Sequence, residues 1–207
     1  LTKNYSHVFE NADFIDLFIG ARDYASSGKL FGSQRALQFG GNPILKHNAK
    51  IYNCTTSYID RIEVFKEIEY LLLCGCGVGV SLQKQHISKL PDMKVGKGTI
   101  PYVIPDSIEG WSLAVEVLFN HYFEASASPI FDYTQIRPKG AMIAGGFKAP
   151  GPDGLRNSLD KIREILEKCK IKNGVLSSIQ LLDIICHLAD SVLSGGVRRS
   201  AISVIFS

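Results

Sequence analysis

The sequence predicts an α/β fold, because segments with a helical spacing of apolar residues alternate with short apolar or β-prone segments. Helices are expected over five stretches: 12–25, 61–74, from 106 onward, 155–168 and 178–193. Strands are expected at 51–59, 78–82 and 201–206. This alternation fits either a small parallel sheet or part of a barrel, and periodicity alone does not choose between them.

Two helices show the clearest apolar faces. Helix 12–25 places five apolar side chains on one side, and Gly28 is expected to end it: Phe14, Leu17, Phe18, Ala21 and Tyr24. The helix from 106 has Asp106 or Ser107 as its cap and Glu109 in its first turn. The stretch 131–152 holds four glycines and three prolines, which predicts a long loop.

Composition limits the class of protein. A chain of 207 residues that is 45% hydrophobic can form one substantial domain, and a net charge of +3 gives no reason to expect nucleic acid or a membrane surface as partner. Five irregularly spaced cysteines suggest neither a disulfide scaffold nor a zinc site. No leader peptide is recognisable, and no apolar run reaches the ~20 residues that span a bilayer. We therefore expect a cytoplasmic protein with reduced thiols.

Three glycine-containing segments are candidate nucleotide-binding elements. Gly75, Gly77 and Gly79 follow a helix and precede a strand, the reverse of a dinucleotide fingerprint, so they also fit a tightly packed turn. Residues 194–200 combine two glycines with two arginines, which suits phosphate or base contacts or, equally, a helix C-terminus. Residues 137–152 add cations and glycines that could close over a nucleotide, or could form an ordinary surface loop.

Cys54 lies in the β-prone stretch between Asn53 and Thr55. A lone cysteine is most often a small buried hydrophobic residue, which is the simplest interpretation on residue type alone. Cys74 and Cys76 are one residue apart and would point to opposite sides of an extended chain, so they are a poor disulfide or metal pair.

The order of the motifs is more specific than any one of them. The series runs Ser33-Gln34-Arg35-Ala36-Leu37-Gln38-Phe39-Gly40-Gly41, Tyr52-Asn53-Cys54, Leu73-Cys74-Gly75-Cys76-Gly77-Val78-Gly79-Val80, Pro105-Asp106-Ser107-Ile108-Glu109-Gly110-Trp111, Phe131-Asp132-Tyr133, Ile136-Arg137-Pro138-Lys139-Gly140-Ala141 and Gly195-Gly196-Val197-Arg198-Arg199-Ser200-Ala201. It resembles the adenosylcobalamin-dependent (class II) ribonucleotide reductases, from about residue 33 onward.

The resemblance implies a fold and a set of site residues. It implies part of a ten-stranded α/β barrel over residues 51–207, preceded by a helical lead-in at 1–50. Cys54 matches the cysteine of the first barrel strand that is oxidised to a disulfide in each turnover. Ser33, Asn53, Gly77 and Gly79 would face the substrate. The two specificity loops, which read an effector nucleotide, would contain the following residues: Arg137, Lys139, Gly145, Gly146, Gly195, Gly196, Arg198, Arg199 and Ser200.

The resemblance also implies partners and missing parts. The family uses adenosylcobalamin, a ribonucleotide substrate, a deoxyribonucleotide or ATP effector and a thioredoxin-like reductant. Its radical-bearing cysteine lies on a finger loop, for which this sequence has no Cys-x-Glu match. We therefore expect a fragment, or one piece of a split enzyme, that needs a C-terminal half. The alternatives are the large subunit of an iron-dependent reductase, a non-catalytic nucleotide-binding module and, more distantly, a Rossmann-like enzyme.

Overall fold

The computed structural model describes residues 12–143, 147–172, 174–192 and 201–206. The chain divides into two compact units, residues 1–53 and 54–207, and each unit is described by itself. In its described residues, 12–53, the first unit contains helices only, and the second unit contains both helices and strands. The α/β class that the sequence predicts is therefore confirmed for the second unit.

The first unit holds helices α1 (Ala12–Ser26), α2 (Gln34–Phe39) and α3 (Asn42–Lys46), and the 3-10 helix η2 (Asn48–Ile51). The expected helix 12–25 is confirmed, and Gly28 follows its end with a φ of 72°, a left-handed conformation that favours glycine. Leu17 is one of the apolar side chains expected to share a face of this helix, yet it is 71% exposed, so it does not pack in a core. Phe39 and Ile44 are buried, so the small core of this unit lies around α2 and α3.

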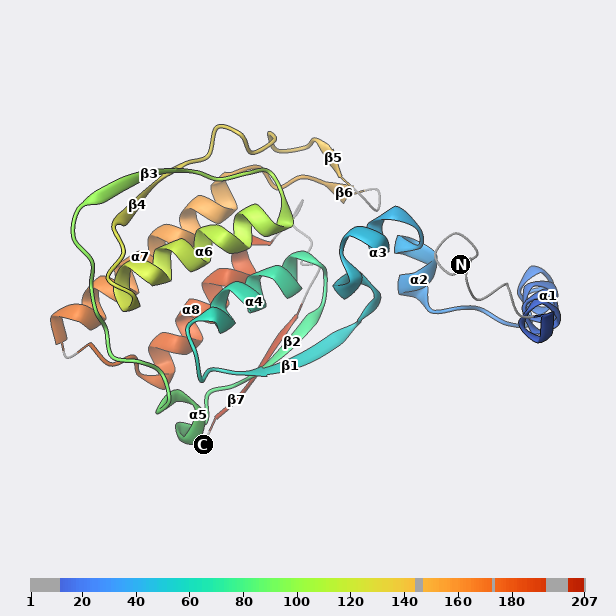
Figure 1. Cartoon of the computed structure of the whole chain (residues 1–207), viewed down its shortest axis with the longest axis horizontal. Coiled ribbons are helices and arrows are strands. Elements are labelled where there is room, and N and C mark those ends of the chain that lie inside the picture. Colours follow the sequence, from blue (N-terminus) through green and yellow to red (C-terminus); the bar gives the residue numbers. More distant parts are fainter. Residues whose placement is uncertain (1–11, 144–146, 173, 193–200, 207) are drawn as a thin grey trace. The chain divides into compact units, whose positions relative to one another are not determined.

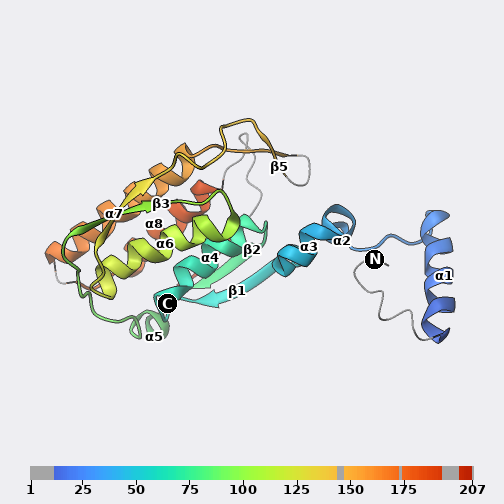
Figure 2. The same ribbon diagram turned by 45° about the horizontal axis from the view of Figure 1, so that its top comes forward.

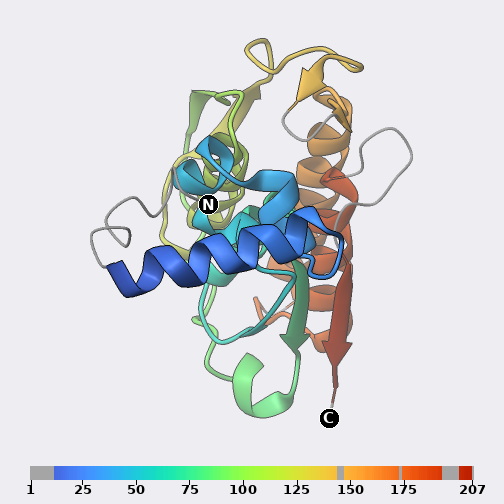
Figure 3. The same ribbon diagram turned by 90° about the vertical axis from the view of Figure 1, so that its right-hand side faces the viewer.

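A parallel sheet of three strands begins the second unit. Strands β1 (Cys54–Tyr58), β2 (Gly77–Ser81) and β7 (Ile202–Ile205) lie in the order β1-β2-β7. Cys54 pairs with Gly77, and Gly79 lies between Thr56 and Ser203. Figure 3 shows β2 and β7 side by side and pointing the same way. Strands β1 and β7 fall within the stretches that the sequence predicts, and β2 begins one residue before the predicted stretch 78–82.

Four further strands were not predicted. Strands β3 (Thr99–Val103) and β4 (Ser128–Asp132) form a parallel pair, and each contains a proline, Pro101 or Pro129, which weakens a strand pattern in sequence. Strands β5 (Met142–Ile143) and β6 (Phe147–Lys148) pair antiparallel. The expectation of an uninterrupted loop over 131–152 is therefore wrong at two places, since it contains the end of β4 and this short hairpin.

Four long helices fill the second unit: α4 (Glu63–Leu73), α6 (Ile108–Phe123), α7 (Asp153–Lys172) and α8 (Ser178–Ser191). A single turn, α5 (Lys84–Ile87), follows β2. Helix α4 packs on β1 and β2, α8 packs on β7, and α6 packs on β4 (Figures 1 and 2). The rings of Phe65 and Phe119 stack at 4.2 Å between α4 and α6, at the centre of the core.

The long helices begin where local chemistry satisfies their first amide groups. Ser107 Oγ accepts a hydrogen bond of 2.9 Å from the Gly110 amide at the start of α6, as the predicted cap requires. Ser177 and Gln180 form a reciprocal capping box at the start of α8. At Gly110 a Cβ atom would lie 2.3 Å from the Pro105 carbonyl oxygen, so only glycine fits this turn.

The described strands form one sheet of three strands and two sheets of two strands, and within these described residues no barrel is closed. Among the same residues, no helix is both long enough and apolar enough to cross a membrane.

We expect Gly110→Ala to destabilise the second unit by about 1–3 kcal/mol, the usual range for overpacking, because its Cβ atom would displace Pro105 from the start of α6. Urea unfolding followed by circular dichroism measures the effect. Gly20→Ala is the control, since no atom lies within 4 Å of the added Cβ atom there. Equal stabilities of the two variants would contradict the packing argument.

A second prediction concerns Tyr122, whose buried hydroxyl donates a 2.7 Å hydrogen bond to Glu167. This bond lowers the pKa of Glu167, so its contribution to stability is present above the ordinary carboxyl value of 4.5 and is lost as the pH falls through the lowered pKa. Tyr122→Phe should lower the free energy of unfolding by about 1 kcal/mol at neutral pH.

The difference between wild type and Tyr122→Phe should shrink when urea unfolding is repeated below the lowered pKa of Glu167. Tyr102→Phe serves as the control, because the Tyr102 ring packs edge-on against Phe131 and that contact survives the change. A Tyr122→Phe deficit that stays constant down to acid pH would show that the loss does not come from Glu167.

Candidate functional site

One face of the sheet β1-β2-β7 is covered by helices and the other is exposed. Val78 and Val80 of β2 are buried, whereas Cys54, Thr56 and Tyr58 of β1 are exposed. Since side chains alternate along a strand, these exposed residues share one face of the sheet. Parallel sheets are normally covered on both faces, so an open face of this kind marks the surface where further structure or a ligand is expected.

Cys54 stands at the start of this open face. Its thiol is free and exposed, so the interpretation of Cys54 as a small buried hydrophobic residue is wrong. Its partner across the ladder is Gly77, which has no side chain to cover the sulfur. At the next position on this face, a Cβ atom on Gly79 would approach Thr56 Cγ2 to 3.1 Å. The two glycines therefore keep the surface beside Cys54 low and accessible.

Two other predicted site residues belong to the first unit. Ser33 precedes α2 and is exposed, and its side chain makes no capping hydrogen bond. Asn53 is also exposed, and its Oδ1 atom accepts a 2.9 Å hydrogen bond from Arg35 Nε. The amide of Asn53 is thereby held in one orientation directly before Cys54 in the chain.

A second cluster forms where β3 and β4 end. The carboxyl ends of parallel strands meet at one edge of a sheet, the usual place for ligands in open α/β folds. β3 leads to Asp106 and the start of α6, and β4 leads to Tyr133 and then Arg137. Arg137 Nε donates a 2.5 Å hydrogen bond to Asp106 Oδ2, which joins the two loops. A cation thus lies beside the positive end of a 16-residue helix, a setting suited to anions.

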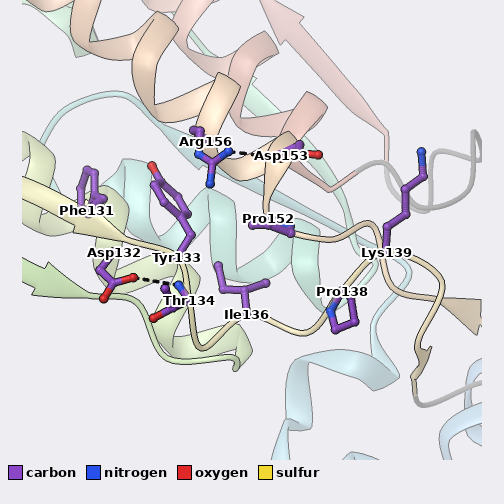
Figure 4. A pocket seen from close by; sticks show the side chains of 10 residues that line it. All are labelled: Phe131, Asp132, Tyr133, Thr134, Ile136, Pro138, Lys139, Pro152, Asp153 and Arg156. Atoms are coloured by element: carbon purple, nitrogen blue, oxygen red, sulfur yellow. Dashed lines mark hydrogen bonds and ion pairs between the residues drawn. The ribbon is translucent and has the colours of Figure 1, made fainter.

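An open hollow of about 710 Å³ lies beside this pair (Figure 4). It is lined by ten residues: Phe131, Asp132, Tyr133, Thr134, Ile136, Pro138, Lys139, Pro152, Asp153 and Arg156. The Arg156 guanidinium lies over the Tyr133 ring at 4.8 Å and also pairs with Asp153 at 3.3 Å. The hollow therefore offers aromatic surface and charges of both signs.

Two titratable groups of the hollow, Asp132 and Tyr133, have shifted pKa values. The Thr134 backbone amide donates to Asp132 Oδ1 at 2.9 Å and lowers the pKa of Asp132, which remains a carboxylate. Burial raises the pKa of Tyr133 to about 12, so its hydroxyl keeps its proton. A carboxylate acceptor and a phenol can both bind hydroxyl groups of a ligand such as a sugar.

The structure groups the predicted loop residues only in part. Arg137 and Lys139 lie at this same edge. Seven others fall outside the described residues: Gly145, Gly146, Gly195, Gly196, Arg198, Arg199 and Ser200. Sequence reasoning missed the contributions of Asp106, Tyr133 and Arg156. From the sequence, Asp106 is assigned the role of a helix cap and not that of a partner of Arg137. No sequence pattern indicates Arg156, because its contact with the Tyr133 ring depends on how α7 packs.

Over the described residues, no group of three His, Cys, Asp or Glu side chains could hold a metal ion.

Comparison with known proteins identifies relatives of one kind, although no family model matches the chain. It is 40% identical over 101 residues to a probable adenosylcobalamin-dependent ribonucleoside-triphosphate reductase of Dictyostelium discoideum, an alignment that covers 48% of this chain and 13% of the relative. The enzyme of the same name from Lactobacillus delbrueckii subsp. bulgaricus is 33% identical over 168 residues, covering 63% of this chain and 22% of the relative. That of Euglena gracilis is 30% identical over 176 residues, with 81% and 24% covered.

A solved structure shares the fold. A crystal structure of a B12-dependent (class II) ribonucleotide reductase matches with a TM-score of 0.66 and 22% identity, over 86% of this chain and 31% of that one. The chain spans about a quarter or less of the length of the three curated relatives. It is therefore homologous to one part of the adenosylcobalamin-dependent ribonucleoside-triphosphate reductases, and it shares the α/β fold of part of the class II enzyme.

Proposed function

We propose that this chain is part of an enzyme that reduces ribonucleotides to deoxyribonucleotides. Residues 51–207 would form the first part of a ten-stranded α/β barrel, with residues 1–50 as a helical lead-in. The observation that carries the proposal is the exposed Cys54 thiol on the open face of a parallel sheet, opposite Gly77. The names of the relatives support the same activity.

Cys54 would act as one member of a redox-active cysteine pair. When two thiols form one S–S bond they release two electrons and two protons, which is what the ribose needs to lose its 2′-hydroxyl as water. The partner thiol would come from the rest of the enzyme. A thioredoxin-like reductant would then restore both thiols by disulfide exchange, for which the exposure of Cys54 is a requirement.

Asn53 and the glycines of β2 would contact the substrate beside this thiol. Asn53 is oriented by Arg35, so its side-chain amide could hydrogen-bond to a ribose or phosphate group. Gly77 and Gly79 have no side chains that would keep a ribonucleotide from the sheet. Ser33, the remaining candidate, has a hydroxyl that is exposed and makes no capping bond, so it is available to a phosphate.

The edge formed by β3 and β4 would bind the effector, a deoxyribonucleotide or ATP. Arg137 beside the N-terminus of α6 suits a phosphate group, and Lys139 lines the adjoining hollow. Two further sets of residues would complete the specificity loops: Gly145 and Gly146, and Gly195, Gly196, Arg198, Arg199 and Ser200. Glycines permit a loop to change conformation, and arginines bind phosphates or base edges.

The complete enzyme would use adenosylcobalamin, whose cobalt–carbon bond supplies a radical when the cofactor is bound. The hollow at β4 does not fit this cofactor, because its wall has neither an imidazole nor a thiol that could approach the cobalt. We therefore assign none of the cofactor's contacts to these residues and derive no step through it.

The remaining parts of the proposal concern partners and alternatives. The C-terminal half would supply the finger loop. We propose a cytoplasmic location, and we propose no nucleic acid or membrane partner.

The names of the relatives favour a cobalamin-dependent enzyme over an iron-dependent one. Dependence of turnover on added cobalamin, rather than on a second radical-generating subunit, distinguishes these two classes. Nucleotide binding without turnover, even with the C-terminal half present, would favour a non-catalytic module instead.

Cys54→Ser should abolish dithiol-dependent reduction of ribonucleotides in the complete protein that contains this chain, because serine cannot form the disulfide. Cys186→Ser is the matched control, since Cys186 is the other exposed cysteine among the described residues and lies on α8. Product is measured as deoxyribonucleotide by chromatography. Turnover by Cys54→Ser, or by the 207-residue chain alone, would overturn the assignment.

Arg137→Ala should weaken binding of a deoxyribonucleoside triphosphate to this chain by about tenfold or more, as expected for loss of a charge-assisted hydrogen bond to phosphate. Isothermal titration calorimetry provides the measurement. Arg61→Ala is a closely matched control, because both arginine side chains are 42% exposed and both are ion-paired. An equal effect of the two substitutions would place the effector elsewhere.

A further inference from the structure

Glu69 is a carboxyl group buried in the core, and the proposed reaction does not use it. The side chain of Glu69 is completely inaccessible to solvent, and its neighbours on α4 include the core residues Ile68 and Leu72. Its Oε1 atom lies 2.7 Å from Ser191 Oγ, and its Oε2 atom has no hydrogen-bond partner. A carboxylate without a counter-ion is strongly disfavoured in such surroundings.

The elements packed against α4 supply no compensating charge. Burial raises the pKa of Glu69 to about 8, and the hydrogen bond between Glu69 and Ser191 only partly opposes this effect. Lys66 of α4 is engaged by Glu116 at 2.9 Å. The remaining titratable groups of α4 and of the elements packed on it are Glu63, Glu67, Tyr70, Glu109, His121, Tyr122, Asp183, Cys186, His187, Asp190, Cys54 and Tyr58.

The heavy-atom distances around Ser191 are a second observation that favours a protonated Glu69. Ser191 Oγ lies 2.7 Å from Glu69 Oε1 and also 2.7 Å from the Leu188 carbonyl oxygen. A hydroxyl carries one proton, and a carbonyl oxygen can only accept. Both short contacts are full hydrogen bonds only if Ser191 donates to Leu188 and a protonated Glu69 donates to Ser191. The geometry therefore matches a neutral carboxylic acid.

The position of this chain of hydrogen bonds gives it a structural role. Ser191 is the last residue of α8, and Glu69 lies in α4. α4 precedes β2 and α8 precedes β7, two neighbouring strands of the sheet that carries Cys54. Gly154 of α7 also packs here, since a Cβ atom on it would lie 3.2 Å from the Ser191 carbonyl oxygen.

We propose that Glu69 and Ser191 form a proton-dependent latch that holds the C-terminal end of α8 on α4, closed while Glu69 is protonated and open once it is ionised. In the open form water can solvate the carboxylate, and Ser191 no longer links α4 to Leu188. The latch does not depend on the proposed reductase activity.

The sign of the pH dependence follows from the two pKa values. Glu69 has a raised pKa in the closed form and an ordinary one when exposed, so closure is complete below about pH 4.5 and weakens as the pH rises toward about 8. Above that value both forms are ionised and no further change is expected. Within this window the opening equilibrium should increase about tenfold for each pH unit.

Amide hydrogen exchange of the 207-residue chain, read by mass spectrometry, tests the latch. After correction for intrinsic rates, protection in the last turn of α8 should fall about tenfold per pH unit between about pH 5 and about pH 8. Glu69→Gln should remove this slope, because its amide can still donate to Ser191 but does not ionise. Glu67→Gln should retain it, because Glu67 is a half-exposed residue of α4 that is paired with Arg61.

Two outcomes would overturn the latch. One is the same slope in Glu69→Gln as in wild type, and the other is an equal slope in α6 and α7, which would report global unfolding. An infrared titration of wild type with ¹³C-labelled glutamate carboxyl groups is the second measurement, needed if Glu69→Gln does not fold. A carboxylic-acid band should persist to near pH 8, and its loss near the ordinary glutamate value of about 4.3 would also overturn the proposal.

Discussion

The arrangement of the second unit depends on how its parallel sheet is covered. Helices α4 and α8 cover one face of β1-β2-β7 over Val78 and Val80; α4 lies between β1 and β2 in the chain, and α8 precedes β7. The opposite face carries Cys54, Thr56, Tyr58 and two glycines, and its side chains on β1 are exposed. Because the helices cover only one face, they stabilise the strands from that side, and the open face remains available to a ligand or to further structure.

Parallel strand pairing also determines where the second cluster forms, at the ends of β3 and β4. β3, α6, β4 and α7 follow one another in the chain, and the parallel pairing of β3 with β4 brings the loops after both strands to one edge. Arg163 of α7 holds this arrangement, because it donates to Ser128 Oγ and to the Pro129 carbonyl oxygen, both at 2.9 Å. The pairing of Arg137 with Asp106 is thus a consequence of strand order and helix docking, not of sequence proximity.

Burial also determines which acidic groups carry charge. Asp132 and Glu69 are both carboxyl groups, yet a backbone amide donates to the first and keeps it ionised, whereas an apolar core surrounds the second. Glu69 lies in the core where α4 meets the end of α8, so a proton on Glu69 affects the contact between these two helices. The two carboxyl groups therefore serve separate purposes, one at a ligand surface and one in the connection between helices.

Local patterns in the chain are enough to predict the α/β class, the long helices, the three strands of the first sheet and the candidate residue Cys54. These features depend on local periodicity, caps and ordered motifs, which are readable along the chain. Only the tertiary structure decided the exposure of Cys54, the strands that contain Pro101 and Pro129, and the partners of Glu69 and Arg137. Such features depend on which segments pack together, and Ser191 meets Glu69 across 122 residues of chain, where no local pattern can indicate the contact.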